Sequence, residues 1–242
     1  MLVASASNVF RCTTSVRLNG LEQVQVCLLS LDASPDDLDT CFGLLSSQER
    51  IRAGRFRFER HRRRFVVCRA LVRHVLGAHI GAAPEQIRFA YGVHGKPRLD
   101  GDVDCGVRFN VSHSGDWALV AITEGKEVGV DIERVTPIDD IEGLMEQVFS
   151  PLEQDTLNAV PEPDRLDAFY AGWTRKEAYI KARGDGLQRA LDTFDIELAP
   201  GEPARLIQVR DEPEEARRWR LESLDTVPGY AAALCVERRR AT

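Results

Sequence analysis

The sequence predicts an α+β protein with two similar lobes, and two observations support that prediction. Segments in which apolar and polar residues alternate indicate strands, and longer segments with apolar residues at helical spacing indicate helices. The order strand, helices, strands occurs twice, with its midpoint near Gly125. We therefore expect an extension over residues 1–20, a first lobe over 21–125 and a second over 126–242, with a functional site at their junction.

The first lobe is expected to contain one strand, a helical region and several short strands. Alternation over 22–31 predicts the first strand, and Ser34-Pro35 opens a helical stretch. Apolar residues at helical spacing predict a long helix over 59–76, with arginines on its other side. Shorter runs predict strands over 87–90, 107–111 and 117–123, the last two around a polar turn of residues 112–116.

The second lobe repeats this order. A strand over 128–135 precedes the helical patterns, and Gly184-Asp185-Gly186 ends the last helix. The expected helices cover 138–148, 151–159 and 165–182, and weaker strands follow over 193–198, 219–224 and 230–236.

Composition limits the possible functions. The chain has 242 residues and a net charge of −6, so the chain as a whole gives no case for nucleic acid binding. No apolar run approaches the length of a membrane span, and the start of the chain lacks a secretory signal. The six cysteines show no close pairing, which favours free thiols in the cytoplasm. We expect a cytoplasmic protein without a membrane partner, and a monomer.

Positive charge is concentrated in one segment. The segment from Arg50 to Arg73 contains ten arginines and one histidine, and its only acid is Glu59. Such a segment on an acidic protein favours a site for a specific anionic ligand. A solvated helix face is the alternative, since that is the usual location of charge runs.

One predicted strand carries a pair of carboxylates. On Val128-Gly129-Val130-Asp131-Ile132-Glu133 the apolar residues face one side, so Asp131 and Glu133 project together from the other. Two adjacent carboxylates repel each other unless a cation lies between them, and Mg²⁺ prefers oxygen ligands. A solvent-facing strand edge is the alternative, and for an isolated pair it is the commoner outcome.

A third carboxylate lies on the last long helix. Trp173, Glu177 and Lys181 share one helix face. Glu177 would complete the oxygen ligands of the ion, while Lys176 and Lys181 would neutralise phosphate oxygens beside it. The alternative is an aromatic core contact next to an exposed Glu–Lys pair.

Two further motifs fit a phosphorylated ligand. The predicted turn Ser112-His113-Ser114-Gly115 offers backbone amides, hydroxyls and an imidazole, which can cradle phosphate, although a plain hairpin turn has the same composition. In Gly95-Lys96-Pro97-Arg98 the proline fixes the backbone, so a flat group could lie against it.

In this order and at these intervals, the four motifs resemble those of the 4′-phosphopantetheinyl transferases. The resemblance is to the single-chain, two-lobed type that activates peptide and polyketide synthases, and it spans roughly residues 24–236. It implies a pseudo-twofold α+β fold with coenzyme A and Mg²⁺ in the cleft between the lobes. It also implies a carrier protein as the partner.

The resemblance also implies roles for individual residues. Asp131, Glu133 and Glu177 would ligate Mg²⁺. The remaining ligand contacts would come from Lys181 and His113 at the pyrophosphate, Ser112 at the nucleotide, Lys96-Pro97 at the adenine, and Arg52, Arg63 and Arg64 as candidates at the 3′-phosphate. Glu49 replaces a phosphate-binding lysine and Phe65 a small hydroxyl residue of one relative, which leaves the 3′-phosphate contacts open. Glu153 matches a family acid without an assigned role.

The resulting hypothesis is an Mg²⁺-dependent transfer of phosphopantetheine from coenzyme A to a serine of an apo acyl or peptidyl carrier protein. Glu177 or a metal-bound water would take the serine proton, with Glu153 as a further candidate. The carrier would dock on residues 135–149, unless that segment is an amphipathic helix packed on its own lobe. The alternatives are an Mg²⁺-dependent hydrolase of coenzyme A or a related nucleotide pyrophosphate, and an anion-binding or RNA-binding module.

Overall fold

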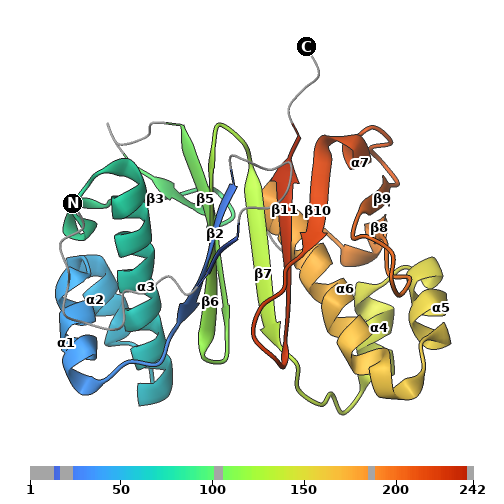
Figure 1. Cartoon of the computed structure of the whole chain (residues 1–242), viewed down its shortest axis with the longest axis horizontal. Coiled ribbons are helices and arrows are strands. Elements are labelled where there is room, and N and C mark those ends of the chain that lie inside the picture. The colour runs from blue at the N-terminus through green and yellow to red at the C-terminus, as the bar shows by residue number, and fades with distance from the viewer. Residues whose placement is uncertain (1–13, 17–23, 101–105, 185–188, 239–242) are drawn as a thin grey trace.

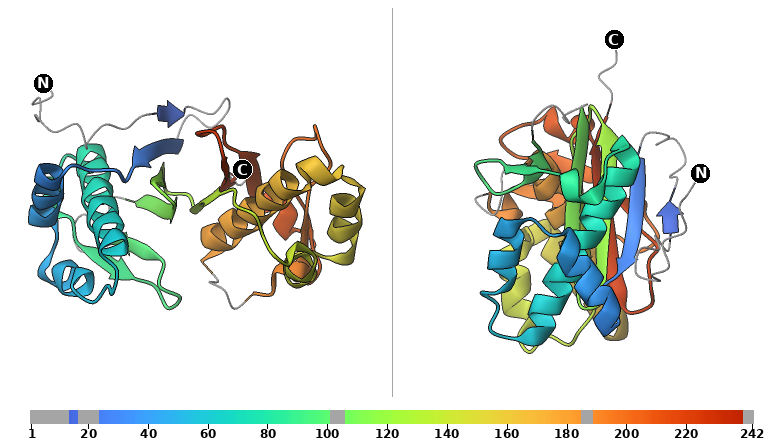
Figure 2. Two further views of the ribbon diagram at one scale, coloured as in Figure 1. Left: turned by 90° about the horizontal axis from the view of Figure 1, so that it is seen from below. Right: turned by 90° about the vertical axis from the view of Figure 1, so that its left-hand side faces the viewer.

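The structure is a computed structural model that describes the chain except residues 1–13, 17–23, 101–105, 185–188 and 239–242. Two groups of helices lie at the outer ends of the molecule, and the main strands lie between them (Figures 1 and 2). The α+β class predicted from the sequence is confirmed. In the described part, no helix is both long enough and apolar enough to cross a membrane.

The first half of the chain forms a helical layer on an antiparallel sheet. Its strands pair in the order β1-β2-β6-β5, and a separate hairpin joins β3 to β4. The elements are β1 Thr14–Val16, β2 Val24–Ser30, α1 Pro35–Leu44, α2 Ser47–Ala53, α3 Glu59–Ile80, β3 Phe89–Tyr91, β4 Pro97–Leu99, β5 Val107–Ser114 and β6 Trp117–Glu124. The expected extension thus contributes β1, and the rest of it lies outside the described residues.

The second half has a similar plan with a smaller sheet. Its strands pair in the order β10-β11-β7, and β8 pairs with β9. The elements are β7 Val128–Arg134, α4 Ile141–Val148, α5 Pro151–Ala159, α6 Glu162–Arg183, β8 Phe194–Ile196, β9 Leu206–Val209, α7 Glu215–Arg218, β10 Trp219–Ser223 and β11 Tyr230–Glu237.

Three apolar cores hold these layers together. One lies between helices α1 to α3 and the first sheet, and another lies beneath α4 to α6. The third is sealed between the two main sheets, where Val26 and Leu119 of the first half belong to one cluster with Val130 and Leu234 of the second. Burial of this apolar surface joins the halves into one body.

Local sequence signals set most helix boundaries. Helices α2 and α5 each begin with a capping box, Ser46 with Glu49 and Ser150 with Glu153. Helix α3 runs beyond the predicted 76 to Ile80, because the chain turns only at its C-terminal cap Gly81. Helix α6 starts at 162 rather than 165, and α4 starts at 141 rather than 138.

The segment expected to dock the carrier packs largely on its own half. Met145 and Val148 of α4 are buried in the second core, and Ile138, Ile141 and Leu144 pack against that core. These contacts favour the alternative of an amphipathic helix covering its own lobe.

Candidate functional site

Strand β7 carries two carboxylates on the face that it turns toward helix α6. Its valines and isoleucine point into the core between the sheets, so Asp131 and Glu133 lie on the opposite face, as predicted. A Cβ atom at Gly129 would lie 2.1 Å from the carbonyl oxygen of Ala178 and 2.3 Å from the nitrogen of Ala182. Glycine at this position therefore lets the backbone of α6 approach β7 and brings the helix against both acids.

Strand β5 supports the acids from the other side. Its alternate polar side chains reach β7, because every second residue of a strand faces the same way. Ser112 Oγ donates to Asp131 Oδ1 at 2.7 Å, and Ser114 Oγ donates to Glu133 Oε2 at 2.7 Å. Asn110 Oδ1, on the same side, accepts from the backbone N–H of Val130 at 2.9 Å.

The predicted phosphate-binding turn is wrong in its extent. Ser112, His113 and Ser114 belong to β5, which pairs with β6 up to Ser114, and only Gly115-Asp116 makes the turn. The ladder continues because the serine hydroxyls bond to acids of β7 and leave the backbone free to pair. These three residues therefore present side chains rather than a concave set of amides.

Helix α6 brings a lysine and a third carboxylate to the same place. Lys181 Nζ donates to Asp131 Oδ1 at 2.5 Å and to Ser112 Oγ at 3.1 Å. Glu177 lies one turn before Lys181 on the helix and is buried. Helix α6 and strand β7 are thus in contact through Lys181 and Asp131, which lie 50 positions apart in the sequence.

The three acids carry more negative charge than their surroundings neutralise. Burial raises the pKa of Glu177, and the charges of Asp131 and Glu133 raise it further, against the opposing effect of Lys181. Burial and Asp131 likewise raise the pKa of Glu133. Asp131 is 1% exposed, and its Oδ2 has no hydrogen-bond partner. A buried carboxylate oxygen without a partner is costly, so this centre is short of a cation or donor.

The donor set suits a hard divalent cation. Oxygen ligands from one or two carboxylates, completed by phosphate and water, are the usual protein site for Mg²⁺. The acids lie close together but do not form a complete metal site. Among the described residues, no three His, Cys, Asp or Glu side chains converge on one metal position. Lys181 instead provides the positive charge at Asp131.

His113 lies at the edge of this centre. Its side chain is exposed, yet the atoms packed around the ring and the charge of Lys181 lower the pKa of its imidazole. The arginine Arg64 adds to this effect. A neutral imidazole at neutral pH can donate one hydrogen bond and accept another.

A cavity of about 720 Å³ opens beside the acids. One wall is the segment from Val93 to Pro97 in the first half, and the other is the face of α6 that carries Glu177, Lys181 and Gly184. Clefts of this size between two parts of a chain are typical small-molecule sites. Lys96 also joins the halves, because its Nζ donates to Glu127 Oε2 at 2.7 Å and to Ala182 O at 2.9 Å.

The three arginines proposed for a phosphate lie outside this cavity. Arg52 stacks on Phe65 at 5.2 Å, in a separate hollow of about 610 Å³. Arg63 donates to the carbonyl oxygen of Ala33, and Arg64 forms an ion pair of 2.6 Å with Asp116. Of the three, Arg64 is the one tied to the acids' surroundings, since Asp116 lies in the turn that follows β5 and Arg64 is among the charges that lower the pKa of His113.

Glu49 has a structural role inside that separate hollow. Its carboxylate forms ion pairs of 2.7 Å with both Arg69 and Arg73. Burial alone would raise the pKa of Glu49, but the charge of Arg69 and the hydrogen bonds from Ser46 and Arg73 lower it. The acid that replaces a lysine of one relative therefore serves as the counter-ion of two arginines on α3.

Lys176 does not belong to the site in which the sequence analysis placed it. It was expected to bind phosphate beside Glu177, but neighbouring positions on a helix point in different directions. Lys176 is fully buried in the second half and forms an ion pair of 2.7 Å with Glu153. Its Nζ also donates to the carbonyl oxygens of Leu191 and Phe194, both at 2.8 Å.

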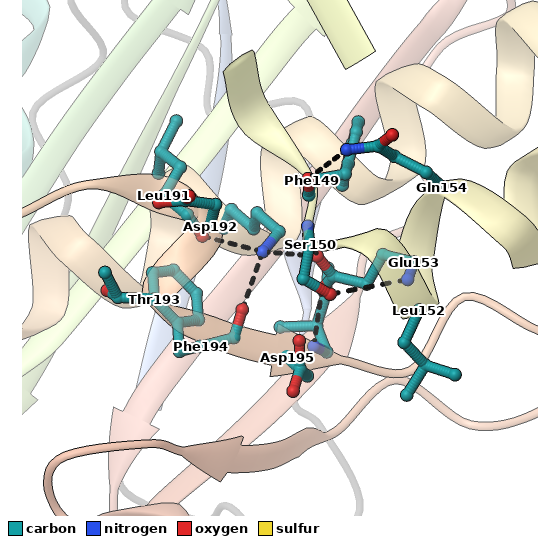
Figure 3. A network of polar contacts seen from close by, with 12 residues as sticks. Phe149, Ser150, Leu152, Glu153, Gln154, Leu191, Asp192, Thr193, Phe194 and Asp195 are labelled. Carbon is teal, nitrogen blue, oxygen red and sulfur yellow. Dashed lines mark hydrogen bonds and ion pairs between the residues drawn. The ribbon is translucent and has the colours of Figure 1, made fainter. Parts of the chain in front are cut away.

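Glu153 is likewise structural. Its Oε2 accepts from the backbone N–H of Ser150 at 2.8 Å and its Oε1 from that of Ile196 at 2.8 Å (Figure 3). The side chain is 2% exposed and lies away from the cavity between the halves. The suggestion that Glu153 takes a proton from the acceptor serine is therefore wrong.

Sequence reasoning missed the residues that support the acids. Asn110 and Ser114 could have been found, because with Ser112 they occupy alternate positions of one strand. Tyr230 could not, since its hydroxyl accepts the backbone N–H of Asp116 at 3.2 Å across the junction of the halves. Nothing local to Tyr230 signals this contact.

Comparisons with known proteins identify the family of the chain. Residues 127–235 match the family model described as the 4′-phosphopantetheinyl transferase superfamily. Residues 31–125 match the model described as the N-terminal part of 4′-phosphopantetheinyl transferase. Both halves of the chain therefore match models of one class of transferases.

Individual relatives align over most of the chain. The 4′-phosphopantetheinyl transferase HetI of Nostoc sp. is 37% identical over 216 residues, which are 89% of this chain and 88% of that protein. The 4′-phosphopantetheinyl transferase Sfp of Bacillus subtilis is 29% identical over 202 residues, 84% of this chain and 86% of that protein. The chain belongs to the 4′-phosphopantetheinyl transferase superfamily.

Proposed function

We propose that this protein transfers the 4′-phosphopantetheine arm of coenzyme A to a serine of an apo acyl or peptidyl carrier protein. One observation carries the proposal: Glu177 and Lys181 line a cavity of about 720 Å³ between the two halves, and Lys181 forms an ion pair there with Asp131. The family to which the chain belongs supports the same reaction. No observation favours hydrolysis of coenzyme A instead.

Coenzyme A would occupy the cavity with its nucleotide against Lys96-Pro97 and its pyrophosphate toward Lys181 and His113. Lys181 already bonds to Asp131 and Ser112, so its ammonium is held in place and can donate to a phosphate oxygen without further ordering. Arg52, Arg63 and Arg64 remain the candidates for the 3′-phosphate.

Asp131, Glu133 and Glu177 would hold Mg²⁺, which supplies positive charge that offsets the charge developing on the pyrophosphate. The orphaned Oδ2 of Asp131 and the raised pKa of both glutamates support this assignment. Strand alternation and helical spacing in the sequence predict the same three acids.

The chemical step is an attack by the serine oxygen of the carrier on the phosphorus that bears pantetheine. The bond between this phosphorus and the bridging oxygen breaks, and adenosine 3′,5′-bisphosphate leaves. We assign the serine proton to Glu177, because its carboxylate lines the cavity beside Lys181. Lys181 and the neutral His113 would donate to the departing phosphate.

The protein would act as a monomer in the cytoplasm. Cys41, Cys68 and Cys235 are buried thiols without a disulfide bond, which supports a reducing compartment.

The direct test is intact-mass spectrometry of apo carrier proteins incubated with the protein, coenzyme A and Mg²⁺. We expect each accepted carrier to gain one phosphopantetheine group, and the gain to disappear when the metal is chelated. Release of adenosine 3′,5′-bisphosphate from coenzyme A alone, at the rate seen with carrier, would instead show a hydrolase.

A further inference from the structure

A basic and aromatic surface lies where α2 leads into α3. Arg55, Arg57 and Arg60 are exposed, and Phe58 stands among them with 54% of its surface accessible. Arg57 and Arg60 stack on the ring of Phe58 at 5.4 Å and 5.9 Å. We call these four residues, together with the 59% exposed Ile51, the basic surface.

The arginines of the basic surface differ from most of those farther along α3. Arg62, Arg64, Arg69 and Arg73 each form an ion pair with an acid. The three arginines of the basic surface form no ion pair with any acid of the described residues. Their charge is therefore not neutralised within the described chain and is available to an acidic partner.

A series of contacts leads from the basic surface toward the carboxylates of β7. Arg60 lies one helical turn before Arg64, whose guanidinium pairs with Asp116 at 2.6 Å. Asp116 belongs to the turn that directly follows Ser114, and Ser114 Oγ bonds to Glu133. A protein seated on the basic surface could therefore present a side chain to the acids of β7.

We infer that the basic surface docks the carrier protein, through a carrier face on which Asp or Glu residues surround an apolar side chain. The inference rests on the proposed function. The arginines supply charge complementarity, and Phe58 and Ile51 supply apolar contact area of the kind found at interface centres. The buried α4 offers less, since its apolar residues already pack on the second core.

An RNA partner fits this position less well than an acidic protein. Arginines beside an aromatic ring can also hold single-stranded nucleic acid. However, the chain carries a net charge of −6, and the contacts that lead from the basic surface through Arg64 and Asp116 run toward the carboxylate of Glu133. A polyanion extending past the surface would meet these acids, whereas a folded carrier brings only one hydroxyl to them.

The test measures transfer and binding separately. We expect Arg57→Glu/Arg60→Glu to raise KM for an apo acyl carrier protein about tenfold or more, and to leave kcat and KM for coenzyme A unchanged. Phe58→Ser should raise the same KM without altering the fold, because the ring is exposed and serine is a good N-cap for α3. Arg217→Glu is the matched control, since Arg217 is 81% exposed on α7.

Direct binding separates this inference from the proposed function. Fluorescence anisotropy of a labelled apo carrier whose target serine is replaced by alanine reports docking without transfer. Weaker binding to the double variant than to Arg217→Glu supports the inference even if no carrier is modified. Equal carrier KM and binding in both variants, a rise only in KM for coenzyme A, or tight binding of a single-stranded RNA oligonucleotide without carrier binding would each overturn it.

Discussion

Each half of the molecule buries a capping-box glutamate against a cation on its long helix, but the two cations differ. Glu49 of α2 pairs with Arg73 of α3, and Glu153 of α5 pairs with Lys176 of α6. The two cations occupy the same position counted from the first residue of their helices. The frame of the fold is thus repeated, with arginine in one half and lysine in the other.

The next residue along each helix shows where the repetition ends. His74 follows Arg73 in the first half, whereas Glu177 follows Lys176 in the second and lines the cavity. The buried pairs satisfy their carboxylates with hydrogen bonds, while the neighbouring centre leaves Asp131 Oδ2 without a partner. A satisfied buried pair indicates structure, and an unsatisfied one beside a cavity indicates function.

The largest expected effect is a difference in stability between variants of the two buried pairs, Glu49–Arg73 and Glu153–Lys176. Glu49→Gln should destabilise the protein by about 3–5 kcal/mol, because the buried guanidinium of Arg73 cannot lose its proton. Glu153→Gln should cost only about 1–3 kcal/mol. Burial lowers the pKa of Lys176, so this amine can lose its proton once its partner is neutral. Urea unfolding of both variants gives the comparison, and an equal or larger loss for Glu153→Gln would contradict it.

A second prediction concerns the unsatisfied centre. Asp131→Asn should lower kcat/KM for transfer by about 10²–10³-fold, because it removes one of the charges that hold the cation. The amide still accepts hydrogen bonds from Ser112 and Lys181, and it relieves repulsion with Glu133 and Glu177. The free energy of unfolding should therefore stay close to that of the parent. Transfer at the parental rate with Mg²⁺ present would remove Asp131 from the metal site.

Lowering the pH should reduce the contribution of the Glu49–Arg73 pair to the free energy of unfolding. The pKa of Glu49 is below its ordinary value of 4.5 in the folded state, so its contribution to stability is complete above that value. The contribution is lost as the pH falls through the folded pKa. The stability difference between the parent and Glu49→Gln should then be large at neutral pH and shrink under acid. A difference that does not depend on pH would show that Glu49 acts by packing alone.

The sequence predicts the acids of the site well because strand and helix periodicity determine the direction of side chains. Alternation on β7 places Asp131 and Glu133 on one face, and helical spacing brings Glu177 and Lys181 together. The same reasoning fails for Lys176, because whether a neighbouring lysine is buried depends on the carbonyl oxygens of Leu191 and Phe194, which approach only in the folded chain. Long-range partners of this kind have no local pattern.

The smallest expected effect tests the contact that joins the halves at the β5–β6 turn. Tyr230→Phe should cost about 1 kcal/mol, because it removes the hydroxyl that accepts the N–H of Asp116 at 3.2 Å. Gly115 has a φ of +55°, and a Cβ there would lie 2.3 Å from the Tyr230 hydroxyl. Gly115→Ala should therefore cost about 1–2 kcal/mol in backbone strain and also displace Tyr230.

The two changes are expected to be less than additive. Once Gly115→Ala has displaced the hydroxyl, its bond to Asp116 is already lost, so adding Tyr230→Phe should cost almost nothing and relieve the clash. Chemical unfolding of both single variants and the double variant measures this coupling free energy. Because Asp116 also pairs with Arg64, full additivity would mean that Arg64 alone holds the turn and that the second half does not help to position it.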